Sequence, residues 1–255
     1  MTSFWVTPAI VLRSWSYGES DKIVSFLTES HGKVTGIAKG AKRSRKRFVN
    51  TLEPFSLVNL RFQDRPARGL AFIHACDLIR VFKNLTTSLE KIAHASYLTD
   101  ITDGLSGERE ENRGLFAHLR EGLSFIEENG TYQPFLTFFE LKLLRLAGYQ
   151  PVLEQCRRCG TGWRGGFRGQ WRFSLRDGGI LCEACSALRK EALPLSLQAL
   201  GIMAELQQVN GIRPNHQSYP CATLREGHLA LLRFIQFQVG RELKSAPFLD
   251  TFSTA

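Results

Sequence analysis

Four of the six cysteines lie in two Cys-x-x-Cys pairs, a spacing that proteins use to bind a metal ion. The first pair is Cys156 and Cys159, and the second, after twenty-two intervening residues, is Cys182 and Cys185. Each pair can direct two thiolates at one point, so together they complete a tetrahedral Zn²⁺ shell. Four thiolates leave no position open for water, and we therefore predict one structural zinc ion. An iron–sulfur cluster and redox dithiols are the alternatives.

The second candidate site is the basic loop, residues 39–47, in which six of nine residues are cationic. Cations packed so densely repel one another unless an anion lies against them, and the phosphates of a nucleic acid are the usual anion. We therefore predict phosphate contacts here, while a solvated basic loop is the alternative. The predicted contacts are Lys39, Lys42, Arg43, Arg45, Lys46 and Arg47.

Three aromatic residues near the basic loop have two interpretations. Phe48 directly follows the loop, and Trp15 and Tyr17 precede it in the chain. Their rings either stack on nucleic-acid bases or belong to the hydrophobic core. The sequence leaves both interpretations open.

No pattern of catalytic residues accompanies the two candidate sites. The chain lacks the His-Glu-x-x-His, P-loop and Gly-x-Ser-x-Gly motifs. Gly160, Gly162 and Gly165 have the spacing of a dinucleotide fingerprint, but they lie inside the cysteine segment and open no helix. We therefore predict that the protein is not an enzyme. The alternative is an enzyme that uses this glycine-rich loop, or Cys76 or Cys221 as a nucleophile.

Charge is unevenly distributed along the 255 residues, whose formal net charge is +9. Residues 1–82 carry a net charge of +7 and residues 151–190 carry +5, whereas residues 83–150 carry −3. A basic balance favours a polyanionic partner, either a nucleic acid or an anionic membrane surface. The N-terminus lacks the features of a signal peptide, and the apolar runs are too short to span a bilayer. We therefore expect a cytoplasmic protein.

Short strands are expected to position the basic loop. Five segments are rich in β-branched and aromatic residues, and turn residues such as Gly18 and Gly32 separate them. These segments are residues 6–13, 22–28, 33–38, 56–62 and 70–76. Five short strands in about eighty residues predict a small closed or nearly closed barrel.

Helical spacing of apolar residues begins after this barrel. The first helical pattern covers residues 85–101, and Thr87 with Glu90 has the spacing of a capping box at its start. Further helices are expected over residues 115–126, 134–146, 196–209 and 223–243. The cysteine segment therefore interrupts a helical region.

Several motifs, taken in order, resemble the RecO family of bacterial recombination mediators. The N-terminal ones are YGESDKIV at residues 17–24, then Thr28, Gly32-Lys33, and AKGA at residues 38–41. The segment FELKLL at residues 139–144, followed by Gly148-Tyr149 and Pro151, resembles the family's central helix. The first cysteine pair, with GGILC at residues 178–182, resembles its zinc motif. The matches span roughly residues 8–185.

The resemblance implies a multi-domain α+β fold. It consists of an N-terminal five-stranded OB-fold barrel followed by an all-α helical domain with an inserted four-cysteine zinc module. The corresponding domains are residues 1–82, 83–150 and 151–190, and residues 191–255 complete the helical domain.

The resemblance also implies a function in RecF-pathway recombinational DNA repair. Such proteins bind single- and double-stranded DNA, anneal complementary strands and work with RecR to load RecA on DNA coated by single-strand-binding protein (SSB). They have no known catalytic site, and they act on the nucleoid. On this resemblance the six cations of the basic loop are DNA contacts. A zinc-ribbon protein that binds RNA or acts in transcription is the alternative.

A binding site for the SSB tail is a further implication of the resemblance. This tail is acidic and closes on an apolar residue, so its site needs an apolar groove with cations at the rim. Lys142 and Arg145 lie among Leu141, Leu144 and Leu146 and are the candidates. Two solvated charges on an amphipathic helix are the alternative.

Overall fold

The computed structural model describes residues 4–64, 69–164, 169–187, 189, 191–211 and 219–252. The chain forms two compact units. Unit 1 is Met1–Gly130 with Lys244–Ala255, and unit 2 is Thr131–Leu243. No helix of the described residues is long and apolar enough to cross a membrane.

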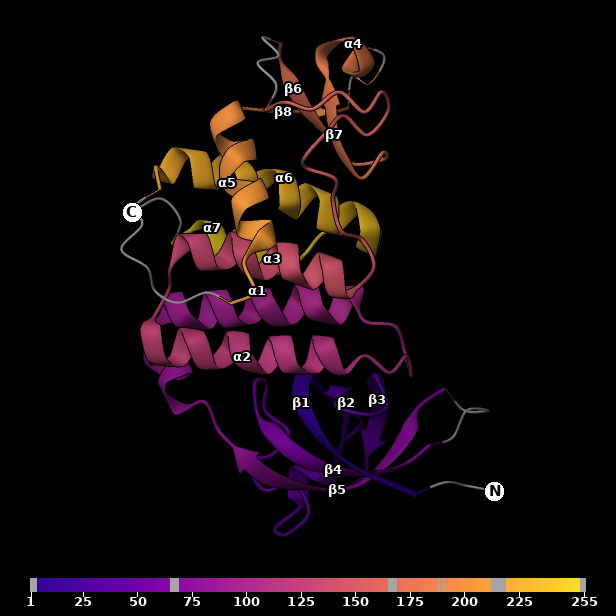
Figure 1. Cartoon of the computed structure of the whole chain (residues 1–255). Helices are drawn as coiled ribbons and strands as arrows, with labels where there is room; N and C mark the ends of the chain where they lie inside the picture. The colour runs from indigo at the N-terminus through magenta and orange to yellow at the C-terminus, as the bar shows by residue number, and fades with distance from the viewer. Residues whose placement is uncertain are drawn as a thin grey trace. The chain divides into compact units, whose positions relative to one another are not determined.

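Unit 1 begins with a barrel, as Figure 1 shows in indigo and purple. Its strands close in the order β1-β2-β3-β5-β4, which confirms the predicted five-stranded OB-fold barrel. The strands are β1 (Phe4–Tyr17), β2 (Asp21–Thr28), β3 (Lys33–Ala38), β4 (Leu57–Gln63) and β5 (Ala71–Arg80). The first strand runs four residues beyond the expected end because residues 14–17 pair with residues 21–24 of β2.

The barrel closes through a short parallel contact. Strands β3 and β5 pair only at Gly36 with Ala71 and at Ile37 with Phe72. Side chains from the segment between β3 and β4 join the same hydrophobic core as the strands; they are Ala41, Phe48 and Leu52. The basic loop is therefore tied to the barrel core, by Ala41 within it and by Phe48 directly after it.

Helices complete unit 1. A 3-10 turn, η3 (Lys83–Thr87), leads into α1 (Leu89–Leu105), which packs against α2 (Arg113–Asn129) and α7 (Ala246–Asp250). The expected capping box at Thr87 and Glu90 is wrong, because the N-cap residue is Ser88 and the Thr87 hydroxyl donates to the Asn84 carbonyl. The 3-10 turn uses Thr87 locally and shifts the start of the helix by one residue.

Unit 2 consists of helices and a small sheet. Helices α3 (Gln133–Leu146), α5 (Leu197–Gln208) and α6 (Cys221–Val239) pack on one another. Between α3 and α5 the chain forms β6 (Trp171–Ser174), β7 (Gly179–Cys182), the short α4 (Glu183–Ser186) and β8 (Leu193–Leu195). The sheet order is β7-β6-β8. The expected insertion of the cysteine segment between helices is confirmed.

Two features of unit 2 differ from the expectation or add to it. Helix α6 ends at Val239, four residues early, because Gly240 takes a left-handed conformation with φ of 71° and stops the helix. The cysteine segment also packs on this helix, since the buried Phe173 ring lies 5.4 Å from the Phe234 ring.

Candidate nucleic-acid interface and metal centre

The basic loop is fixed to the turn between β1 and β2. Gly40, in a left-handed conformation with φ of 68°, donates its backbone N–H to the Asp21 carboxylate at 2.8 Å. The Lys42 backbone N–H donates to the Ser20 carbonyl at 2.9 Å, and the Lys42 Nζ donates to the Gly18 carbonyl at 2.8 Å. The start of the loop is therefore held to one turn by three hydrogen bonds.

Asp21 is the anchor of this arrangement. The hydrogen bond from the Gly40 N–H, followed by those from the Ser20 hydroxyl and the Lys39 ammonium, lowers the pKa of Asp21 below its ordinary value. Asp21 therefore stays ionised near neutral pH and keeps accepting these bonds. Sequence reasoning assigned it no role, because nothing in the spacing links residue 21 to a loop nineteen residues later.

All six cations of the basic loop are exposed, but they divide into two groups. Lys39 lies 3.4 Å from Asp21, Lys42 bonds to the turn, and Arg47 donates to the Lys39 carbonyl at 2.9 Å. The side chains of the remaining three make no ion pair or hydrogen bond within the described part of the chain; they are Arg43, Arg45 and Lys46. These three are available to an external anion.

Phe48 does not belong to this surface. Its ring is 5% exposed and lies in the barrel core, so the base-stacking interpretation of Phe48 is wrong. Trp15 and Tyr17, by contrast, are 44% and 53% exposed.

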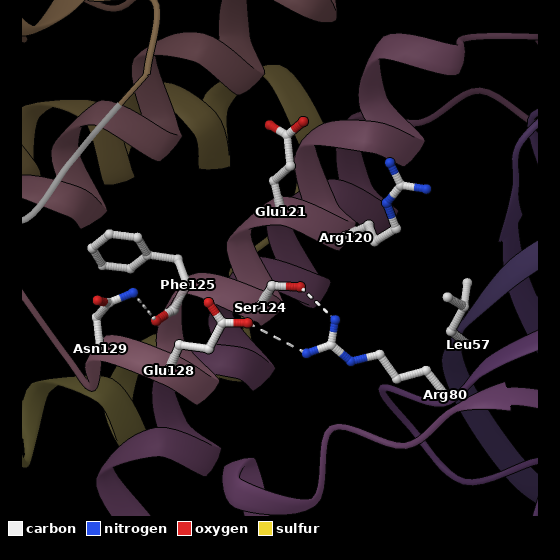
Figure 2. Close-up of a pocket in the computed structure, with 8 residues that line it drawn as sticks. All are labelled: Leu57, Arg80, Arg120, Glu121, Ser124, Phe125, Glu128 and Asn129. Carbon is white, nitrogen blue, oxygen red and sulfur yellow. Dashed lines mark hydrogen bonds and ion pairs between the residues drawn. The ribbon is translucent and has the colours of Figure 1, made fainter.

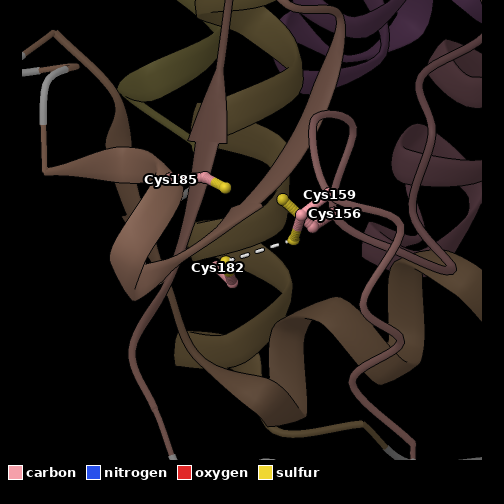
Figure 3. A group of neighbouring side chains, drawn as sticks. All are labelled: Cys156, Cys159, Cys182 and Cys185. Carbon is pink, nitrogen blue, oxygen red and sulfur yellow. Dashed lines mark hydrogen bonds between the residues drawn. The ribbon is translucent and has the colours of Figure 1, made fainter.

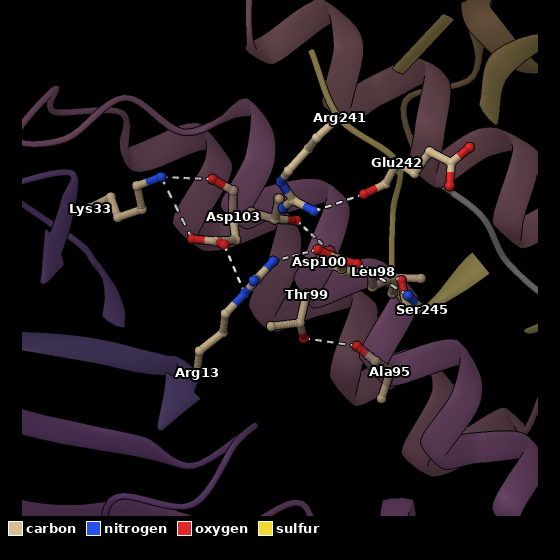
Figure 4. A network of polar contacts seen from close by, with 11 residues as sticks. Arg13, Lys33, Ala95, Leu98, Thr99, Asp100, Asp103, Arg241, Glu242 and Ser245 are labelled. Carbon is tan, nitrogen blue, oxygen red and sulfur yellow. Dashed lines mark hydrogen bonds and ion pairs between the residues drawn. The ribbon is translucent and has the colours of Figure 1, made fainter. Parts of the chain in front are cut away.

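Other cations of the barrel are neutralised by acidic residues within unit 1. Arg13 forms ion pairs with both Asp100 and Asp103 of α1, and Lys33 lies 3.6 Å from Asp103 (Figure 4). The Ser245 hydroxyl also donates to Asp100, at 2.9 Å. These cations hold the barrel to a helix and are not available to a ligand.

Arg80, at the end of β5, is neutralised in the same way. Its guanidinium lies 2.6 Å from Glu127. It also lies 3.6 Å from Glu128 and donates to the Ser124 hydroxyl, as Figure 2 shows. Two more barrel cations form ion pairs on the surface: Arg61 with Asp77, and Lys22 with Glu53.

The arginines of the cysteine segment are mostly partnered as well. Arg158 and Arg189 each lie 3.3 Å from Asp177. Arg164 pairs with Glu154 and Arg176 with Glu191. Within the described ranges, three neighbouring cations without an internal partner therefore occur in the basic loop and not in this segment.

The four cysteines converge on one point, as Figure 3 shows. Their sulfur atoms all lie within 4.8 Å of one another, and the Cys159 and Cys182 sulfurs are 3.7 Å apart. A tetrahedral Zn²⁺ site with Zn–S bonds of about 2.3 Å places its sulfurs roughly 3.8 Å apart. None of the four is in a disulfide. The group therefore has the composition and spacing to hold a metal ion.

Local structure explains why the sulfurs meet. In the first pair, the Gly160 N–H donates to the Cys156 carbonyl at 2.9 Å, and Gly160 takes the φ of 75° that this tight turn requires. In the second pair, Cys182 ends β7, and Cys185 lies one helical turn later in α4. Each pair is thus a turn whose two side chains project to the same side.

The surroundings of Cys159, Cys182 and Cys185 shift their thiol pKa values in opposite directions. Hydrogen bonds from Thr161 lower the pKa of Cys159 to about 6. Burial raises the pKa of Cys182, and the neighbouring Cys182 and Cys159 thiols raise that of Cys185 to about 12. A bound metal cation would compensate this crowding of negative charge, which fits the four-cysteine metal site.

The structure places the residues of the enzyme alternative, which are Cys76, Cys221 and the glycine-rich loop, in three different environments. Cys76 is 3% exposed, and burial raises its thiol pKa far above the ordinary range, so it is not an activated nucleophile. Cys221 is exposed at the first residue of α6. Gly160 and Gly162 belong to the turn of the metal site, and Gly165 lies outside the described residues.

Lys142 and Arg145 both lie on α3, as expected. The Lys142 ammonium is 5.6 Å from the centre of the Phe138 ring, and Arg145 is exposed. Leu141 and Leu144 are buried in unit 2, so the two leucine side chains do not line a surface groove. A role for the two cations in binding a tail stays a prediction.

Two family descriptions match this chain and together cover most of it. The family description "Recombination protein O N terminal" matches residues 1–82, and "Recombination protein O C terminal" matches residues 86–247. The chain belongs to the RecO family.

Several relatives match over nearly their full length. The chain is 37% identical to a DNA repair protein RecO of Syntrophus aciditrophicus, over 96% of this chain and 94% of the relative. It is 34% identical to a DNA repair protein RecO of an Anaeromyxobacter species, over 98% of this chain and 97% of the relative. It is 31% identical to a DNA repair protein RecO of Bacillus pumilus, over 94% of this chain and 91% of the relative. Membership of this family supports a role in DNA repair and recombination.

Proposed function

We propose that this RecO-family chain is a DNA-binding recombination mediator of RecF-pathway repair, without a catalytic step of its own. One observation carries the proposal: the basic loop is anchored to an OB-fold barrel and presents Arg43, Arg45 and Lys46, which have no ion pair or hydrogen bond from their side chains among the residues that the structure describes. The barrel cations Arg13, Lys22 and Arg61 are neutralised by ion pairs, so among these described residues the unpaired positive charge lies on the basic loop. Phosphate groups of single- or double-stranded DNA are the anions that fit it.

The mechanism we infer for annealing is electrostatic. Two complementary strands repel each other because both backbones are negatively charged. A loop held in place by Asp21 can contact phosphates without losing much conformational freedom on binding, and neutralising the backbones lowers the barrier to pairing. Phosphate contacts carry no sequence information, so this activity would be independent of sequence.

The partners follow from the family. We propose that the protein works with RecR to load RecA on SSB-coated DNA, and that Lys142 and Arg145 contact the acidic SSB tail. We expect it to act on the nucleoid. The division into residues 1–82, 83–150, 151–190 and 191–255 also stays a proposal.

We also propose that the four cysteines hold one structural Zn²⁺ ion. Residues Cys156, Cys159, Cys182 and Cys185 would hold it. Four thiolates close the coordination shell, so the ion would stabilise the fold of the segment and would not activate water. Its effect on function would be indirect, through the folding of unit 2.

The experiment that tests the function is an annealing assay with fluorescently labelled complementary oligonucleotides, bare or coated with SSB, with and without RecR. The proposal expects faster annealing on both substrates and RecA filament formation on the coated strand only when RecR is also present. An equal affinity for RNA, without any stimulation of annealing, would instead favour the RNA-binding alternative.

A further inference from the structure

Trp15 and Tyr17 are two large aromatic side chains that the barrel leaves in solvent. They lie at the end of β1, with 44% and 53% of their surface exposed. Within the described part of the chain, neither ring stacks on another aromatic or cationic side chain. Burying an aromatic ring is favourable, so two neighbouring exposed rings are a surface that a ligand can cover.

The strand register places these rings on the same face as the basic loop. Tyr17 pairs with Asp21 across β1 and β2, and Asp21 in turn lies 3.4 Å from Lys39 at the start of the loop. Trp15 pairs with Ile23, which pairs with Ile37 of β3. Side chains of directly paired residues project from the same face of a sheet. The aromatic rings and the first cation of the loop therefore share one face of β1, β2 and β3.

A further contact joins the end of β1 to the basic loop. Lys42 donates its Nζ to the Gly18 carbonyl, directly after Tyr17. Arg13, two residues before Trp15 on the same strand, forms ion pairs with Asp100 and Asp103 of α1. The two exposed rings therefore lie along β1 between the ion pairs of Arg13 with α1 and the contact of Gly18 with the basic loop.

We infer that Trp15 and Tyr17 form a base-stacking subsite for single-stranded nucleic acid, with the basic loop holding the backbone beside it. This inference rests on the proposed DNA-binding function. Residues two apart on a strand are about 6.6 Å apart, so each ring can take a separate base of an extended strand. Bases in a duplex are already stacked, so the subsite would favour single strands over duplexes.

Three ligands of equal length distinguish stacking from phosphate binding: a single strand with bases, the same strand with abasic sites at every position, and a duplex. Stacking on one ring accounts for about a five- to 150-fold gain in affinity. The Trp15→Ala/Tyr17→Ala variant should therefore bind the base-containing strand about 20-fold or more weakly than wild type. Its affinity for the abasic strand and the duplex should change less than about two-fold, and its salt dependence should stay the same, because no phosphate contact is lost.

Two variants control for folding and for a general effect of removing aromatic rings. Trp15→Phe/Tyr17→Phe keeps both π faces and should restore most of the affinity. Trp5→Ala removes another exposed ring, whose centroid lies 4.5 Å from that of His31, and should leave binding unchanged. Circular dichroism of each variant checks that the barrel is folded.

The outcomes separate this inference from the proposed function. The stacking subsite is overturned if wild type binds the abasic and base-containing strands equally, or if the Trp15→Ala/Tyr17→Ala variant loses affinity for all three ligands alike. The proposed function has its own test, since neutralising Arg43, Arg45 and Lys46 should weaken binding of all three ligands. A loss in that variant, together with unchanged binding by the aromatic variant, would retain DNA binding and reject stacking.

Discussion

Replacing Arg43, Arg45 and Lys46 together with alanine is expected to weaken DNA binding by a similar factor for any sequence. These three side chains are exposed and have no ion pair or hydrogen bond among the described residues. Replacing them with alanine therefore removes no such contact within the described part of the protein. The loop itself should stay folded, because Asp21 still accepts from the Gly40 N–H and Phe48 still fills the core. A loss of affinity would therefore report on contacts with DNA.

The magnitude follows from counterion release. The logarithm of the binding constant falls linearly with the logarithm of the salt concentration, and each phosphate contact contributes about 0.9 to this slope on duplex DNA and about 0.7 on a single strand. Three lost contacts should flatten the slope by up to about 2.7 on a duplex and about 2 on a single strand. At 0.1 M salt this corresponds to a loss of affinity of roughly 500-fold and 100-fold, respectively.

The assay is fluorescence anisotropy with labelled oligonucleotides across a salt series. The matched control is Arg61→Ala/Arg113→Ala/Arg176→Ala, which also removes three positive charges, but from side chains that each form an ion pair. The control should keep a slope close to that of wild type. Equal slopes for wild type and the basic-loop variant would show that these three cations make no phosphate contacts. Equal losses in both triple variants would show that only net charge matters and would refute the argument from internal pairing.

Three further predictions concern the metal, the core and pH. Cys182→Ala should lose the metal ion and destabilise unit 2, whereas Cys221→Ser should keep one zinc per chain; elemental analysis of both, purified under reducing conditions, checks this. Phe48→Ala should cost about 3–5 kcal/mol of unfolding free energy, and Val49→Ala, which truncates an exposed side chain, should stay within about 0.5 kcal/mol, as measured by urea denaturation. Because the pKa of Asp21 is lowered on folding, its contribution to stability is present above its ordinary pKa of 3.8 and is lost as pH falls through the folded value. Asp21→Asn should therefore be less stable than wild type at pH 7, and the difference should shrink toward about pH 3; a constant difference would contradict the anchoring role.

Local patterns in the sequence were sufficient for much of the fold. The five barrel strands were predicted because apolar residues alternate and turn residues separate them, and each observed strand overlaps its expected range. The helices were predicted from apolar spacing, with errors at their ends, where a 3-10 turn precedes α1 and Gly240 stops α6. Such ends depend on a few backbone angles that apolar periodicity does not report.

The sequence by itself determined the two candidate sites, because both depend on residues close together in the chain. Two Cys-x-x-Cys pairs have few uses other than a metal site, and six cations in nine residues favour an anionic partner nearby. Only the tertiary structure decided which cations are available and which aromatic rings are exposed. Arg13 is neutralised by an aspartate 87 residues away, Phe48 is buried in the barrel core, and Trp15 is 44% exposed. These outcomes depend on long-range contacts, in which burial and charge pairing are set by residues that are distant in the sequence and adjacent only after folding.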